Sequence, residues 1–167
     1  MLDNLAIISR IINEHQTIRG HVKLVGDSVS DEEAMERLER VRADFSPGQA
    51  PLLSEKHDRL RQTMAYLDEG LRNHFAFEEK FLPPLLGELI MRALVLEHSK
   101  IASSIDNVKA IVAVAKLEGL GREELIARES RMQQAIYEMC HLVEEHAARE
   151  ETVLGMVQRG LQDKEQK

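Results

Sequence analysis

Residues 74–79 read His-Phe-Ala-Phe-Glu-Glu, and residues 146–151 read His-Ala-Ala-Arg-Glu-Glu. In both stretches a histidine is followed four residues later by a glutamate. On an α-helix, positions i and i+4 lie about 40° apart around the axis and ~6 Å apart along it, so each pair projects from one face. Apolar residues at helical spacing continue this face in both directions. The two stretches therefore predict helices that carry polar pairs on their core side.

Four segments carry such apolar stripes, with residues spaced alternately by three and four positions, the period of a packed amphipathic helix. Glycines and prolines fall between the segments, where they interrupt helices. The four stripes run from Leu5 to Val25, from Leu60 to Phe81, from Met91 to Ala115 and from Met132 to Val157. Four helices with mostly short connections predict an all-α fold, an up-down-up-down antiparallel four-helix bundle.

The remaining segments are a connector and a tail. In the connector, Ser30-Asp31-Glu32-Glu33 matches a capping box, which predicts a short extra helix over about 31–44. A chain of 167 residues fits one domain. We expect this single domain to cover residues 1–161, followed by a polar tail over 162–167 that frays.

The informative feature of the four stripes is what interrupts them. Each stripe carries one histidine, and the second and fourth also carry a glutamate. Burying six such groups in an aliphatic core is prohibitive unless they satisfy one another or a metal. The chain also repeats itself, because an E-H-x-x-I helix precedes an H-x-x-x-E-E helix twice. Two half-sites of this kind form a dinuclear metal cradle, and the six candidate ligands are His15, His74, Glu78, His98, His146 and Glu150.

This order of motifs, from about Leu5 to Leu161, resembles the hemerythrin-like, or HHE cation-binding, family. The resemblance implies a hemerythrin-like bundle with two iron ions, manganese or zinc being less suitable, bridged by the carboxylates of Glu78 and Glu150. Oxygen-carrying members have a fifth histidine one turn after the third-helix histidine. Here that position is Ala102. A site with four histidines and two glutamates is more similar to the branch of the family linked to iron–sulfur cluster repair and the response to nitric oxide.

These observations predict a non-haem di-iron protein that binds or senses O2 or NO, or handles iron under oxidative or nitrosative stress. Two alternatives stay open. One is a di-iron enzyme that reduces NO or peroxide or repairs iron–sulfur clusters, and the other is a metal-stabilised interaction module. The expected partners are small molecules, namely O2, NO or peroxide, and the sequence indicates neither a protein partner nor catalytic residues outside the ligand set.

Other ionisable residues have simpler interpretations. The six candidate ligands on the apolar stripes are called the seam residues below. A polar network without metal is the alternative interpretation of these six residues. Three further histidines lie off the seam or far from the site along it, and we expect them not to be ligands: His21, His57 and His141. Four glutamates lie about 100° around the helix from their neighbouring ligands. For these a solvated face is favoured over a role as outer acceptors for the ligand histidines: Glu14, Glu79, Glu97 and Glu151.

Composition excludes several classes of function. The chain has 22 basic and 29 acidic residues and a formal net charge of −7, which argues against nucleic acid as a partner. Its longest apolar runs are far shorter than the roughly 20 residues that span a bilayer, and the N-terminal residues do not match a signal peptide. One cysteine, Cys140, forms no internal disulfide. We therefore expect a cytoplasmic protein with no membrane association.

Overall fold

A computed structural model describes residues 3–30, 50–113 and 121–165 of the chain. Within these ranges all regular structure is helical. The helices are α1 (Asn4–Ser30), α3 (Ala50–Phe81), α4 (Pro83–Ala113) and α5 (Arg122–Glu165). The predicted all-α fold is confirmed.

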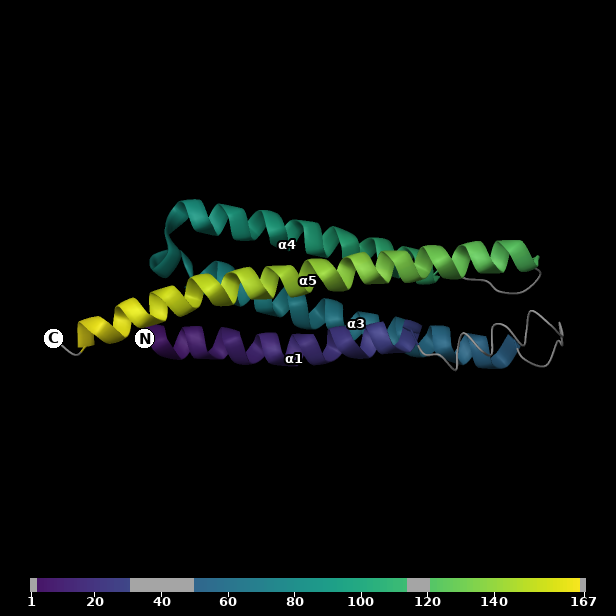
Figure 1. Ribbon diagram of the computed structural model, residues 1–167, viewed down its shortest axis with the longest axis horizontal. Coiled ribbons are helices and arrows are strands. Elements are labelled where there is room, and N and C mark those ends of the chain that lie inside the picture. Colours follow the sequence, from purple (N-terminus) through teal and green to yellow (C-terminus); the bar gives the residue numbers. More distant parts are fainter. Residues whose placement is uncertain (1–2, 31–49, 114–120, 166–167) are drawn as a thin grey trace.

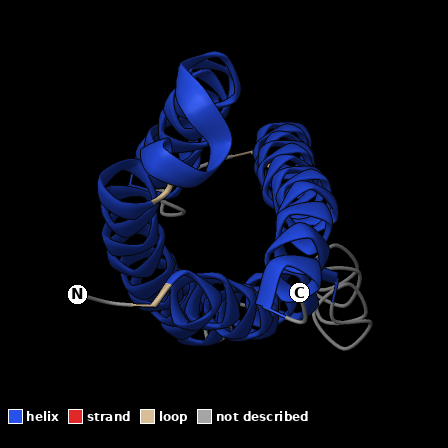
Figure 2. Cartoon of the chain, turned by 90° about the vertical axis from the view of Figure 1, so that its left-hand side faces the viewer, coloured by secondary structure: helices blue, strands red, loops and turns tan. Residues whose placement is uncertain are grey.

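The four helices form one bundle. Figure 1 shows them side by side, each running opposite to the one before it, with both termini at the same end. Viewed along the bundle, the helices surround a common axis (Figure 2). Contacts follow the chain order around this axis, because α1 packs on α3, α3 on α4, α4 on α5, and α5 back on α1. Each helix therefore has two neighbours, and all four faces meet at the centre.

The junction between α3 and α4 shows how the sequence sets the helix boundaries. Proline lacks the N–H that a helix interior needs but is tolerated in a first turn, so Pro83 begins α4 directly after α3 ends. One turn later Gly87 leaves the helical conformation with φ 75° and ψ 167°, which glycine adopts without a Cβ clash. The chain thus reverses direction within a few residues, and α4 starts with a kink.

The apolar core is divided into two layers by a polar one. On one side of the polar layer, buried aliphatic residues of all four helices surround Leu67 and Ile105, and on the other a smaller cluster surrounds Ile8 and Leu154. Burial of such side chains contributes about 1.5–3 kcal/mol each. The two layers pack the four helices together on both sides of the level at which the polar residues project inward.

Three features differ from the expectations or lie outside them. The extra helix predicted over 31–44 lies outside the described residues. Helix α1 continues to Ser30, beyond the glycine at position 26 where its apolar stripe ends. Helix α5 continues to Glu165, into the tail that we expected to fray. A single glycine does not end a helix, and residues 162–165 contain neither glycine nor proline.

A second buried polar contact joins α3 to α5 away from the bundle's polar layer. His57 is 6% exposed and Glu129 is 8% exposed, and the Nε2 atom of His57 lies 3.1 Å from a carboxylate oxygen of Glu129. An unpaired buried polar group costs about 1–3 kcal/mol.

We therefore expect Glu129→Ala to lower the free energy of unfolding by about that amount without changing metal content. Urea unfolding followed by circular dichroism measures the change, and an exposed-site control, Glu69→Ala, should leave the midpoint unchanged.

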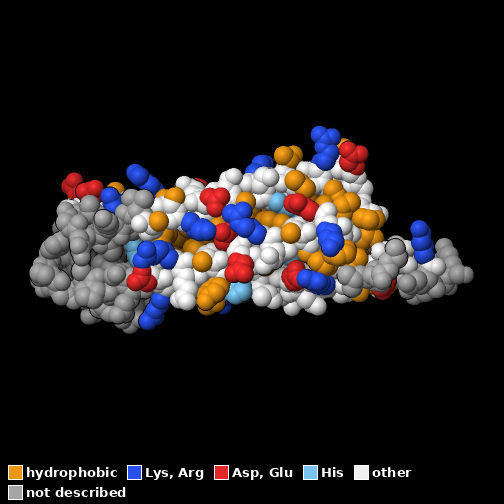
Figure 3. Space-filling model, turned by 180° about the vertical axis from the view of Figure 1, so that it is seen from behind, with side chains coloured by type: hydrophobic (Ala, Val, Ile, Leu, Met, Phe, Trp, Pro, Cys, Tyr) orange, Lys and Arg blue, Asp and Glu red, His pale blue; other side chains and the backbone are white. Residues whose placement is uncertain are grey.

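The surface is mixed in character. Acidic and basic side chains are interspersed with apolar ones over the face shown in Figure 3. None of the helices in the described ranges contains a stretch long and apolar enough to cross a membrane.

Candidate metal centre

The structure brings the six seam residues together in the polar layer between the two apolar clusters. Every one of the six is at most 4% exposed. All four helices contribute: α1 supplies His15, α3 supplies His74 and Glu78, α4 supplies His98, and α5 supplies His146 and Glu150. Their side chains converge because each occupies a core position of its helix at the same depth of the bundle.

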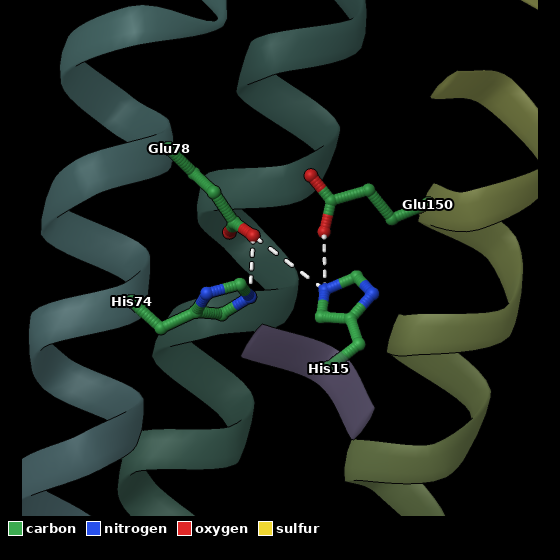
Figure 4. A group of neighbouring side chains, drawn as sticks. All are labelled: His15, His74, Glu78 and Glu150. Atoms are coloured by element: carbon green, nitrogen blue, oxygen red, sulfur yellow. Dashed lines mark ion pairs between the residues drawn. The ribbon is translucent and has the colours of Figure 1, made fainter. Parts of the chain in front are cut away.

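Glu78 lies at the centre of this layer. Its Oε1 atom is 2.5 Å from Nε2 of His74 and 3.6 Å from Nε2 of His15. Its other oxygen, Oε2, is 3.2 Å from Nε2 of His98. Figure 4 shows the Glu78 carboxylate directed at the rings of His15 and His74. One carboxylate oxygen therefore faces each side of the site.

Glu150 spans the same two sides from α5. Its Oε2 atom is 3.3 Å from Nε2 of His15 and 3.5 Å from Nε2 of His146. The four imidazoles themselves form two pairs, since the ring centroids of His15 and His74 are 4.8 Å apart and those of His98 and His146 are 5.0 Å apart. Two histidine pairs with two carboxylates between them have the arrangement of two adjoining half-sites.

The donor atoms are suited to metal ions. Two groups of ligand atoms each lie within 4.8 Å of one another, and Glu78 belongs to both: His15, His74, Glu78 and Glu150 in one, and Glu78, His98 and His146 in the other. All four inward Nε2 atoms and all four oxygens of the two glutamates are buried. Although some of these nitrogens and oxygens lie 2.5–3.6 Å apart, none of them makes a hydrogen bond of normal geometry among the described residues. Buried polar atoms in folded proteins are otherwise satisfied. The residues present therefore fit bound cations.

The outward nitrogen of every site histidine meets a further glutamate. The distances from Nδ1 to the carboxylate oxygen are 3.1 Å, 2.8 Å, 2.9 Å and 2.9 Å for the pairs His15–Glu151, His74–Glu14, His98–Glu79 and His146–Glu97. The sequence-based preference for a purely solvated face at these four glutamates was wrong. Each lies beside a candidate ligand on its own helix, but the imidazole that it contacts belongs to a neighbouring helix.

Three arginines anchor this outer layer. Arg19 donates to Glu151 at 2.6 Å, Arg10 to Glu14 at 2.7 Å, and Arg149 approaches Glu97 at 3.1 Å. Although partial burial alone would raise the pKa of each of these glutamates, their histidine and arginine partners lower it below the usual value. The three carboxyls are thus ionised, and each accepts a hydrogen bond from the Nδ1–H of its histidine.

The inner glutamates and His15 influence one another's charge. Burial lowers the pKa of His15, but the carboxylates of Glu150 and Glu78 outweigh burial and raise it to about 9. Burial likewise opposes ionisation of Glu78, yet the rings of His15, His74 and His98 hold its pKa far below the usual range. For Glu150, burial and the nearby Glu78 carboxylate raise the pKa. Glu78 is therefore held ionised, whereas Glu150 retains its proton more readily.

Sequence reasoning did not identify Phe75 as part of the site. This residue is 6% exposed, and its ring stacks on that of His98 with centroids 4.0 Å apart and planes 10° apart. The same ring meets His146 edge-on at 5.6 Å. Phe75 follows the candidate ligand His74 and lies off the apolar stripe, so nothing in the sequence beyond its aromatic character indicated that its ring would cover the neighbouring imidazoles.

The other histidines and Cys140 lie outside the cluster. His141 is exposed and pairs with Glu145 at 3.2 Å on the surface of α5, whereas His57 contacts Glu129 as described above. The Cys140 thiol donates to the carbonyl oxygen of Val22 at 3.8 Å, and burial raises its pKa to about 11. A thiol in this environment stays protonated and unreactive.

The fold and the site define a class of protein, a helical bundle with a buried histidine and glutamate centre that could hold metal ions. The chain matches the family described as Hemerythrin HHE cation binding domain over residues 6–157. It therefore belongs to the hemerythrin HHE cation-binding family, and its function includes binding a metal cation. Comparison with curated proteins gave no significant match, and neither did comparison with solved structures.

Proposed function

We propose that this chain binds two iron ions through its six seam residues and uses them to bind or sense O2 or NO, or to handle iron under oxidative or nitrosative stress. The observation that carries the proposal is the set of eight buried, inward-facing donor atoms that have no hydrogen-bond partner in the described part of the chain. An apolar core does not maintain such atoms unless an occupant satisfies them.

The number of ions follows from the two histidine pairs. Glu78 directs one oxygen to each side of the site, and Glu150 reaches one histidine of each pair. One ion cannot use all six residues fully, whereas two ions that share the carboxylates can. Imidazole and carboxylate donors suit iron, with manganese or zinc as less favoured occupants.

The chain's own residues give the centre its chemical setting. When bound, two iron ions supply redox electrons and binding positions for small oxidants. Protein groups hold the imidazoles, exclude water through the two apolar layers and keep Glu78 ionised. Among the described residues, every ionisable side chain that faces the centre is a candidate ligand or contacts one, so binding and sensing are favoured over catalysis.

Metal analysis tests the number of ions. We expect protein purified from iron-supplied cells to contain about two iron ions per chain, because each histidine pair with shared carboxylates offers a complete half-site. Inductively coupled plasma mass spectrometry with quantitative amino-acid analysis gives the ratio. A ratio near one that persists under iron saturation would contradict the dinuclear reading.

Reaction with oxygen tests the kind of function. Ala102 offers no ligand atom, unlike the histidine that the family resemblance places there in oxygen carriers. We therefore expect air to oxidise the reduced, iron-loaded protein without reversal when oxygen is removed. Visible absorbance during cycles of oxygen and argon measures this. Full spectral recovery over repeated cycles would instead indicate an oxygen carrier, and sustained consumption of NO or peroxide would indicate an enzyme.

A further inference from the structure

The four outer glutamates form a closed circuit around the bundle. Each helix supplies one glutamate, and that glutamate contacts the site histidine of the next helix in the contact order. The circuit runs from Glu14 of α1 to His74 of α3, from Glu79 of α3 to His98 of α4, from Glu97 of α4 to His146 of α5, and from Glu151 of α5 back to His15 of α1. Among the described residues, none of the four glutamates contacts the site histidine of its own helix through Nδ1.

We infer that these four glutamates are positioning residues: each accepts a hydrogen bond from Nδ1–H of one site imidazole and so keeps Nε2 directed inward, where it can bind a metal in place of a proton. This inference rests on the proposed metal site. Which nitrogen of a histidine binds a metal is set by the hydrogen bond that the other nitrogen makes. Because the acceptor always comes from a neighbouring helix, correct packing of each helix pair is also what orients the donor atoms.

One of the four glutamate–histidine contacts, which we call the corners of the circuit, differs from the other three: the contact between Glu79 and His98. Glu14, Glu97 and Glu151 each form an ion pair with an arginine, and they are 28–31% exposed. Glu79 is 44% exposed and has no cationic partner other than His98 within the described ranges. At this corner the Phe75 ring stacks on His98 instead. We therefore assign the orientation of His98 jointly to Glu79 and Phe75, and the orientation of the other three histidines chiefly to their glutamates.

The Glu97–His146 corner offers the sharpest test. Glu97→Ala removes the acceptor, whereas Glu97→Gln keeps an oxygen that accepts from Nδ1–H and removes only the charge. In the metal-free chain, 15N NMR shifts at pH 8 report which nitrogen of His146 carries the proton. We expect Nδ1 in the unaltered chain and in Glu97→Gln, and a shift toward Nε2 in Glu97→Ala. Competition with a chromophoric chelator then measures affinity for Fe²⁺ and Zn²⁺.

Loss of a hydrogen-bond partner behind a ligand histidine lowers metal affinity by about 10–100-fold. We expect a loss in this range for Glu97→Ala, a clearly smaller one for Glu97→Gln, and none for the exposed control Glu69→Ala. Glu79→Ala should lose less affinity than Glu97→Ala, because Phe75 still holds His98. The double variant Phe75→Leu with Glu79→Ala should lose at least as much as Glu97→Ala.

Each outcome decides a separate question. If Glu97→Ala keeps the proton on Nδ1 and binds metal as tightly as the unaltered chain, the glutamates are not positioning residues. If Glu97→Gln loses as much affinity as Glu97→Ala, their role is electrostatic and the inference is wrong. If the unaltered chain takes up neither metal, the proposed function fails, while the NMR result still shows whether the circuit sets the protonated nitrogen. Far-ultraviolet circular dichroism of each variant confirms that the bundle remains folded.

Discussion

Glu78→Ala is expected to reduce metal affinity by more than about 100-fold, exceeding the 10–100-fold range seen when a partner behind a ligand is lost. Glu78 is fully buried and belongs to both groups of ligand atoms. Its two oxygens face the histidines on opposite sides of the site, so one substitution removes a donor from each half. Metal content after purification and chelator competition with Fe²⁺ measure the loss.

The adjacent glutamate on α3 is the matched control. Glu79 differs by one position, about 100° around the helix, and is 44% exposed. Glu79→Ala should therefore lose far less metal than Glu78→Ala, and on α5 Glu151→Ala should lose less than Glu150→Ala. Equal losses within each pair would show that the register of both helices toward the metal is wrong by one residue.

The inner site could be predicted from sequence because it is encoded by helical periodicity. His74 and Glu78 interrupt an apolar stripe at its own spacing, and the same arrangement recurs at His146 and Glu150. In a bundle, positions on a stripe face the common axis, so helical geometry alone places them in the core. Only the depth of each residue along the axis needed three-dimensional information, and the structure brings all six into two groups of ligand atoms that share Glu78.

The contacts between the four outer glutamates and the site histidines could not be predicted in the same way. Glu97 lies one residue from His98, and its direction along α4 fits a solvated face as well as a contact with another helix. What decides is the offset between α4 and α5, which puts His146 and Arg149 within reach of its two oxygens. Such offsets arise from the packing of apolar side chains at distant positions, and no local pattern in the sequence records them.

The contact between His57 and Glu129 illustrates the same limit. His57 lies on the apolar stripe of α3, and its distance along the chain from His74 correctly separated it from the inner site. Its partner, however, is 72 residues away on α5. Spacing within one helix can exclude a residue from a site, but it does not identify a partner on another helix.

Removing the metal is expected to lower the melting temperature by about 8–16 °C for each ion that is bound. An ion that binds only the folded chain, present at 1,000 times its dissociation constant, stabilises it by about 4 kcal/mol. For a chain of this size each kcal/mol shifts the melting temperature by about 2–4 °C. The shift is large because the site's donor atoms have no hydrogen-bond partner among the described residues. Differential scanning calorimetry of the iron-loaded and chelator-treated protein measures it.

Glu78→Gln separates metal stabilisation from the packing of the bundle. Glutamine has nearly the volume of glutamate and keeps a polar group beside the rings of His15 and His74, so the metal-free variant should melt within a few degrees of the metal-free unaltered chain. The increment on adding iron should disappear, because the shared anionic donor is gone. Leu67→Ala is the opposite case: it opens a cavity at a fully buried residue and should destabilise both forms by a similar 2–5 kcal/mol or so. If Glu78→Gln keeps the full increment, the stabilising ion binds elsewhere and the six seam residues are a polar network rather than its ligands.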